Sequence, residues 1–193
     1  MKDIAKEILT IKAFEINEAG FNWASGIKSP FYCDNRKILS YPGLWKKIID
    51  KFCEKLNDYQ FDGVAGVATA GIAHASAISY QMNKPLVYVR SKAKGHGQKN
   101  LIEGELSQIQ SVVVIEDLFS TGSSALKAVK ALEEQGKDVL SICSIFSYDL
   151  KKLKDNFRAY NYFSLLTVDD MISISNLSES EKKVVQDFLT EHR

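Results

Sequence analysis

Hydrophobic positions in the first forty residues begin with a helical spacing and then lose it. Four apolar side chains, three or four positions apart, predict an opening amphipathic helix: Ile4, Ile8, Ile11 and Phe14. We expect this helix to end near Gly20, because glycine commonly follows the last residue of a helix. From residue 21 to residue 41, glycine and proline interrupt the pattern, which favours irregular or short β structure. We interpret residues 21–41 as a small hood over a main sheet.

The rest of the chain alternates between helical patterns and short apolar runs. Pro42 suits the first turn of a helix, and the apolar face predicted for that helix consists of Leu44, Ile48, Ile49, Phe52 and Leu56. Further helices are predicted over residues 72–82, 123–134 and 179–191, and strands over residues 63–68, 86–90, 112–115, 138–146 and 162–166. This alternation implies right-handed crossovers, and hence an α/β fold with a mainly parallel sheet flanked by helices. Ligands of such sheets bind at the carboxyl ends of the strands.

Length and composition indicate one ordinary globular domain. The 193 residues are 45% hydrophobic and 25% charged, so we expect a single domain, with the first helix and the hood in about 1–41 and the core in about 42–193. A formal net charge of +1 argues against a nucleic-acid partner. The sequence has no long apolar run and does not start with a signal peptide, so we expect no membrane partner and a cytoplasmic location. Three widely spaced cysteines argue against a disulfide framework or a zinc site.

The most specific chemical signal follows the predicted strand 112–115. Two acids are followed by a predicted turn at 117–122 that opens a helix; this segment consists of Glu116, Asp117, Leu118, Phe119, Ser120, Thr121, Gly122, Ser123 and Ser124. Gly122 permits a tight turn whose backbone N–H groups and hydroxyls can hold a terminal phosphate at the helix N-terminus. The two carboxylates can accept hydrogen bonds from vicinal hydroxyls one sugar's length away. We therefore expect residues 112–132 to bind a phosphorylated ribose. In isolation, Asp117 could simply begin a turn and Ser123 could cap the helix.

A second signal is a cluster of positive charge. Residues 91–104 contain three glycines and few apolar residues, which predicts a long loop, and the basic side chains in or next to it are Arg90, Lys92, Lys94, His96 and Lys99. We interpret Lys92 and Lys99 as solvated surface charges. Arg90, Lys94 and His96 could instead close over a polyanionic leaving group and neutralise its charge as a bond breaks.

These segments resemble the motifs of a known enzyme family. Residues 112–124 are similar to the phosphoribosyl-pyrophosphate signature of type I phosphoribosyltransferases, with Glu116 where that family often has aspartate. Residues 89–104 and 25–36 resemble the catalytic loop and the N-terminal hood segment of orotate phosphoribosyltransferases. The resemblance implies the type I phosphoribosyltransferase fold. It also implies transfer of the phosphoribosyl group to orotate, which gives orotidine 5′-monophosphate and pyrophosphate in pyrimidine biosynthesis.

The resemblance assigns roles to individual residues. The donor site would consist of Arg90, Lys94, His96, Glu116, Asp117, Leu118, Phe119, Ser120, Thr121, Gly122, Ser123 and Ser124. Within it, Glu116 and Asp117 would hold the ribose hydroxyls and residues 120–124 the 5′-phosphate, and the catalytic residues would be Lys94, His96 and Asp117. Ser120 and the ring of Tyr32 would contact orotate. Mg²⁺ would be the cofactor, held mainly by the substrate and not directly by the protein, and the enzyme would be a homodimer whose basic loop reaches the partner's active site.

The sequence also departs from the pattern of some relatives. Ala24, Ala70 and Ser91 stand where those relatives have lysine, and Phe146-Ser147-Tyr148 supplies no arginine for the orotate carboxylate. Two other functions stay open at this point: transfer to a purine, and a non-catalytic regulator that senses phosphoribosyl pyrophosphate. The basic loop and the hood favour orotate over a purine. The arginine, lysine and histidine of that loop favour an enzyme over a sensor.

Overall fold

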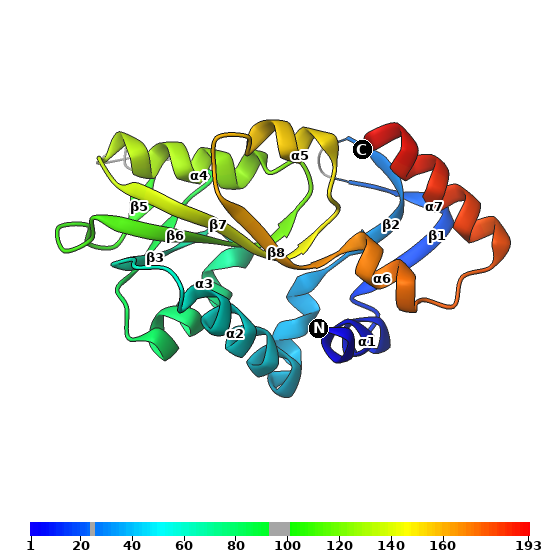
Figure 1. Cartoon of the computed structure of the whole chain (residues 1–193), viewed down its shortest axis with the longest axis horizontal. Helices are drawn as coiled ribbons and strands as arrows, with labels where there is room; N and C mark the ends of the chain where they lie inside the picture. The colour runs from blue at the N-terminus through cyan, green and yellow to red at the C-terminus, as the bar shows by residue number, and fades with distance from the viewer. Residues whose placement is uncertain (24–25, 93–100) are drawn as a thin grey trace.

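A mainly parallel six-stranded sheet forms the centre of the computed structural model, which describes residues 1–23, 26–92 and 101–193 (Figure 1). The strands are β3 (Gly63–Val67), β4 (Leu86–Val89), β5 (Ile102–Glu103), β6 (Ser111–Phe119), β7 (Asp138–Ser147) and β8 (Tyr162–Thr167). Their order is β5-β4-β3-β6-β7-β8, and only the pairing of β4 with β5 is antiparallel. The predicted α/β class with a mainly parallel sheet is confirmed.

Helices cover both faces of this sheet. Helices α2 (Pro42–Leu56) and α3 (Ala70–Met82) lie on one face, and α4 (Ser123–Glu134) and α5 (Lys151–Asn156) lie on the other (Figure 1). Along β6, Val113 and Ile115 belong to one hydrophobic core, whereas Val112 and Val114 belong to the second. Burial on both faces explains why this strand reads as a continuous apolar run. The five apolar residues predicted for the face of α2 are all buried.

The hood is a separate two-stranded antiparallel sheet. Its strands are β1 (Phe14–Asn22) and β2 (Lys28–Cys33), followed by a short 3-10 helix, η1 (Asn35–Ser40). The C-terminal helix α7 (Glu179–His192) packs against both strands, so the two ends of the chain build this part together (Figure 1). Trp23, Phe31 and Phe188 fill the space between them with aromatic contacts at centroid distances of 5.1 to 6.0 Å.

Predicted boundaries are wrong in two regions of the chain. The first helix, α1 (Lys2–Thr10), ends ten residues before Gly20, because Lys12 adopts a left-handed φ of 51° and Phe14 then pairs with Cys33 as strand. The hood therefore begins at residue 14, not at residue 21. The predicted turn at residues 117–122 is also too long, since β6 continues pairing with β7 as far as Phe119.

Short elements went unpredicted. They are β5, α5 and α6 (Val168–Ile174), with two, six and seven residues. Such lengths carry little periodicity, which is why the sequence pattern does not reveal them. Within the described ranges, none of the helices has both the length and the apolar character needed to span a membrane.

Candidate active site

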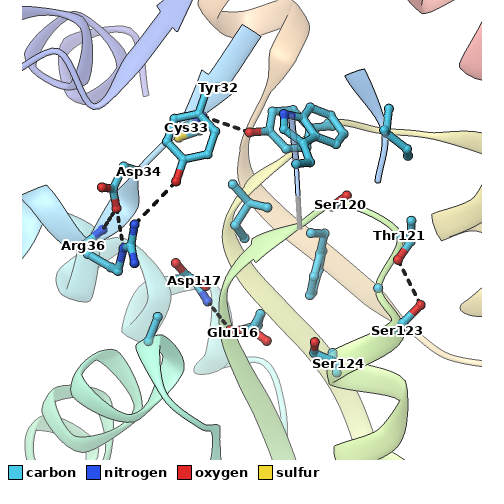
Figure 2. Close-up of a pocket in the computed structure, with 18 of the residues that line it drawn as sticks. Tyr32, Cys33, Asp34, Arg36, Glu116, Asp117, Ser120, Thr121, Ser123 and Ser124 are labelled. Atoms are coloured by element: carbon cyan, nitrogen blue, oxygen red, sulfur yellow. Dashed lines mark hydrogen bonds and ion pairs between the residues drawn. The ribbon is translucent and has the colours of Figure 1, made fainter. Parts of the chain in front are cut away.

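A cavity of about 760 Å³ opens at the carboxyl ends of β3, β6 and β7, under the hood (Figure 2). It is lined by Asn22, Trp23, Ile27, Tyr32, Cys33, Asp34, Arg36, Ala68, Thr69, Ala70, Glu116, Asp117, Leu118, Phe119, Ser120, Thr121, Gly122, Ser123, Ser124, Ala125, Tyr148 and Lys152. The position agrees with the rule that parallel sheets bind ligands at the carboxyl ends of their strands. The contiguous segment from residue 116 to residue 124 forms one wall.

Two adjacent carboxylates end β6. Glu116 is only 8% exposed, and its Oε1 accepts a hydrogen bond from the Asp117 backbone N–H at 3.0 Å. Burial raises the pKa of Glu116 well above its ordinary value, and the negative charge of Asp117 adds to the effect. The Asp117 carbonyl is fixed from the hood, because Asn35 Nδ2 donates to it at 2.7 Å. Asn35 is completely buried, so this bond ties η1 firmly to the end of β6.

The phosphate loop, residues 120–124, connects β6 to α4. Gly122 has a φ of +73° and is the N-terminal cap of α4, and a Cβ at this position would lie 2.7 Å from Leu153 Cδ1. Asn156 Nδ2 donates to the Thr121 carbonyl at 2.7 Å, which fastens the loop to α5. The loop thus lines the cavity at the positive, N-terminal end of α4, where Thr121 Oγ1 and Ser123 Oγ lie 2.9 Å apart. Such a site suits a phosphate.

Aromatic side chains also line the cavity. The Trp23 and Tyr148 rings stack with centroids 4.0 Å apart and an interplanar angle of 17°. Trp23 Nε1 donates to the Phe31 carbonyl at 3.0 Å, and the Cys33 N–H donates to Tyr148 Oη at 2.8 Å. Burial raises the pKa of Tyr148, so its phenol stays neutral. Neither ring was identified as a site residue from the sequence, although Tyr148 follows the carboxyl end of a predicted strand, which is a usable signal.

A polar group from the hood completes the lining. Tyr32 stacks on Phe21 at 5.6 Å, and its hydroxyl accepts a hydrogen bond from Arg36 Nη2 at 3.4 Å. Arg36 Nε also donates to Asp34 Oδ1 at 2.6 Å, and this bond lowers the pKa of Asp34. Figure 2 shows Tyr32, Asp34 and Arg36 together at one side of the cavity, across from the phosphate loop.

The structure brings only part of the predicted site together. Tyr32 and all of residues 116–124 line the cavity, although the Phe119 side chain is fully buried. Arg90 is absent from this lining: it follows β4, and its Nη1 lies 3.3 Å from Glu103 Oε1. Lys94 and His96 lie outside the described residues.

The segment after β3 adds to the lining residues that the predicted site does not include, although Ala70 is one of the positions where some relatives have lysine. Residues 68–70 line the cavity, and the peptide bond between Ala68 and Thr69 is cis. Next to them, a Cβ at Gly71 would lie 2.5 Å from the Ile115 carbonyl oxygen, so glycine allows α3 to approach β6. Across the described ranges, no three histidine, cysteine or acidic side chains are grouped so that they could hold a metal by themselves. The Mg²⁺ assignment stays a prediction.

Comparison with known proteins agrees with this geometry. A family described as "Phosphoribosyl transferase domain" matches residues 35–179. The orotate phosphoribosyltransferase of Oceanobacillus iheyensis is 46% identical over 196 residues, which cover 97% of either chain. That of Listeria innocua is 49% identical over 180 residues, covering 90% of this chain and 86% of the relative.

A solved structure shows the same fold. The orotate phosphoribosyltransferase from Aeropyrum pernix superimposes with a TM-score of 0.75 and 27% identity, over 88% of this chain and 96% of that chain. The type I phosphoribosyltransferase fold expected from the sequence is thus confirmed. The match to the family and the identity to full-length relatives lead to one conclusion: this chain belongs to the phosphoribosyltransferase family, as a member of its orotate phosphoribosyltransferase group.

Proposed function

We propose that this protein transfers the phosphoribosyl group of phosphoribosyl pyrophosphate to orotate, forming orotidine 5′-monophosphate and pyrophosphate for pyrimidine biosynthesis. One observation carries the proposal most directly. The two carboxylates at the end of β6 and the phosphate loop at the start of α4 line one cavity, in the order that a ribose 5-phosphate requires. The relatives named above are orotate phosphoribosyltransferases, which supports orotate as the acceptor.

The reaction replaces the bond between ribose C1 and a pyrophosphate oxygen by a bond between C1 and N1 of orotate, and N1 gives up its proton. Positive charge develops on the ribose ring as pyrophosphate leaves. Glu116 and Asp117 would accept hydrogen bonds from the ribose hydroxyls, while residues 120–124 would hold the 5′-phosphate. Fixing the sugar at both ends places C1 in line between the entering and leaving groups. Because N1 of orotate is itself the nucleophile, the displacement needs none from the protein, and we infer direct transfer without a covalent enzyme intermediate.

Charge on the leaving group is the main catalytic problem. Arg90, Lys94 and His96 of the basic loop would stabilise the departing pyrophosphate, in keeping with their resemblance to the catalytic loop of the family. Mg²⁺ would be held mainly by the pyrophosphate and the ribose hydroxyls, with Glu116 and Asp117 acting through the ribose or through water. When bound, Mg²⁺ would neutralise pyrophosphate charge.

Three assignments beyond the reaction complete the proposal. We infer a homodimer in which the basic loop of one subunit reaches the active site of the other, as the resemblance of residues 89–104 implies. Tyr32 would contact the pyrimidine ring from the hood, and Ser120 would contact it from the phosphate loop. A cytoplasmic location is the one predicted from the sequence.

Turnover of orotate tests the function directly. Protein, Mg²⁺ and phosphoribosyl pyrophosphate are mixed with orotate, and the loss of its ultraviolet absorbance is followed, with adenine, xanthine and uracil in parallel reactions. We expect rapid consumption of orotate alone. Turnover of a purine in its place would contradict the assignment, and binding of the donor without turnover of any base would indicate a sensor.

A further inference from the structure

The acceptor places a specific demand on the cavity, and the inference that follows rests on the proposed transfer to orotate. The carboxylate of orotate is bonded to the ring carbon next to N1, the atom that forms the bond to ribose. It must therefore lie beside the sugar, inside the cavity. A carboxylate removed from water needs cationic or N–H donors. Two acidic residues in the lining, Asp34 and Asp117, make the need for a cation greater.

Two cationic side chains from the described ranges line the cavity, Arg36 and Lys152. Arg36 already has partners, because its Nε is 2.6 Å from Asp34 Oδ1 and its Nη2 is 3.4 Å from Tyr32 Oη. Lys152 differs, since no hydrogen bond or ion pair connects its side chain to the part of the chain that the structure describes. Its charge is available to a ligand.

Helix α5 determines where Lys152 lies. The chain leaves β7, turns at Asp149 with a φ of 54° and enters α5. The helix is anchored to the phosphate loop by the 2.7 Å hydrogen bond from Asn156 to the Thr121 carbonyl. Of the three lysines in α5, Lys152 alone lines the cavity. Lys154 forms an ion pair instead, with its Nζ 3.1 Å from Asp149 Oδ2. The anchored helix thus offers one lysine to the ligand.

A second group in the same cavity points to the same ligand. Ser120 Oγ is buried and has no hydrogen-bond partner among the described residues. A buried hydroxyl without a partner costs free energy, which a ligand oxygen can recover. The 5′-phosphate of the donor has the backbone N–H groups at the start of α4, whereas the carboxylate of orotate has no such set of donors. We propose that Lys152, together with Ser120, binds the carboxylate of orotate and selects orotate over pyrimidines that lack this group.

Two nucleotides, the product orotidine 5′-monophosphate and its analogue uridine 5′-monophosphate, isolate this contact because they differ only in the carboxylate. Their dissociation constants are measured by calorimetry for the wild type and for Lys152→Gln. We expect affinity for orotidine 5′-monophosphate to fall about 10- to 100-fold, the loss of a charge-assisted hydrogen bond. Affinity for uridine 5′-monophosphate should not change. Lys152→Arg should restore most of the discrimination, and Lys151→Gln, on the same helix but outside the cavity lining, should retain all of it.

Turnover provides an independent readout. Lys152→Gln should raise the KM for orotate and leave the KM for phosphoribosyl pyrophosphate unchanged. Equal losses of affinity for both nucleotides would overturn the proposal and assign Lys152 to the 5′-phosphate. Unchanged affinities for both would overturn it too, and leave Lys152 as a solvated charge. A wild-type protein that does not distinguish the two nucleotides would contradict the proposed function itself, so the two failures are distinguishable.

Discussion

At the scale of single residues, the site holds a carboxyl group in surroundings that oppose its charge. Glu116 is buried at the end of β6 beside Asp117, and no cation of the described residues forms an ion pair with it. Above the ordinary glutamate pKa, the folded protein therefore holds a proton that the unfolded chain releases. Stability contributed by this group is fully present below the unfolded pKa, and it is lost as pH rises through the raised folded pKa. A ligand hydroxyl that donates to Glu116 would offset the cost.

The substitution Glu116→Gln should therefore stabilise the ligand-free protein while impairing it as an enzyme. We expect the gain to be small near pH 4.5 and about 1 kcal/mol or more at pH 8, which raises Tm by roughly 2–4 °C for a chain of this length. The kcat/KM should fall, because an amide is a poorer acceptor for ribose hydroxyls. Thermal unfolding at both pH values measures the effect, with Glu134→Gln on the exposed part of α4 as control. An equal gain at both pH values would show that the charge of Glu116 is not its cause.

At the scale of elements, the phosphate loop depends on its packing against α5. Gly122 needs its left-handed φ of +73°, and it also needs to lack a side chain, because a Cβ would lie 2.7 Å from Leu153 Cδ1 and 2.8 Å from Phe157 Cζ. Gly136 provides a matched comparison. Its φ is +69°, and no atom lies within 4 Å of the position of a Cβ. Alanine at Gly136 would introduce backbone strain alone, whereas alanine at Gly122 would add steric overlap with α5.

Alanine at the two glycines should have unequal effects. Gly136→Ala should cost about 1–2 kcal/mol for the left-handed backbone alone and leave activity intact. Gly122→Ala should cost roughly 2–4 kcal/mol, because overpacking adds to the strain, and should also weaken donor binding by moving the loop N–H groups. Urea unfolding and the KM for phosphoribosyl pyrophosphate measure the two quantities. Equal destabilisation by both substitutions would refute the role assigned to the contact with α5.

The elements also show which features can be predicted from sequence. The segment from residue 116 to residue 124 was identifiable because its chemistry is contiguous and follows an apolar strand. Asn35 and Tyr148 were not, since their hydrogen bonds span 82 and 115 residues. The predicted first helix is too long because Phe14 fits the helical spacing of Ile4, Ile8 and Ile11 as well as it fits a strand. Its pairing with Cys33, nineteen positions later, decides the matter, and a local pattern contains no such information.

At the scale of the whole molecule, the order of strands places the basic loop apart from the two carboxylates with which it must act. The basic loop follows β4, whereas the carboxylates end β6, and β3 lies between them, so the two strand ends are roughly 10 Å apart. The strand order alone allows the basic loop to act in either active site of a dimer. The resemblance of residues 89–104 to a family loop favours the site of the partner. This choice decides whether an isolated subunit holds a complete active site.

Mixing two inactive variants distinguishes the arrangements. Lys94→Ala removes a loop cation and Asp117→Asn removes a carboxylate, and each variant alone should be nearly inactive. The two are mixed in equal amounts under conditions that exchange subunits. If the loop acts in the partner's site, half of the dimers are mixed and each has one intact site, so about a quarter of wild-type activity should return. If the loop acts within its own subunit, every site carries one substitution, and activity should stay at the level of the separate variants at every mixing ratio.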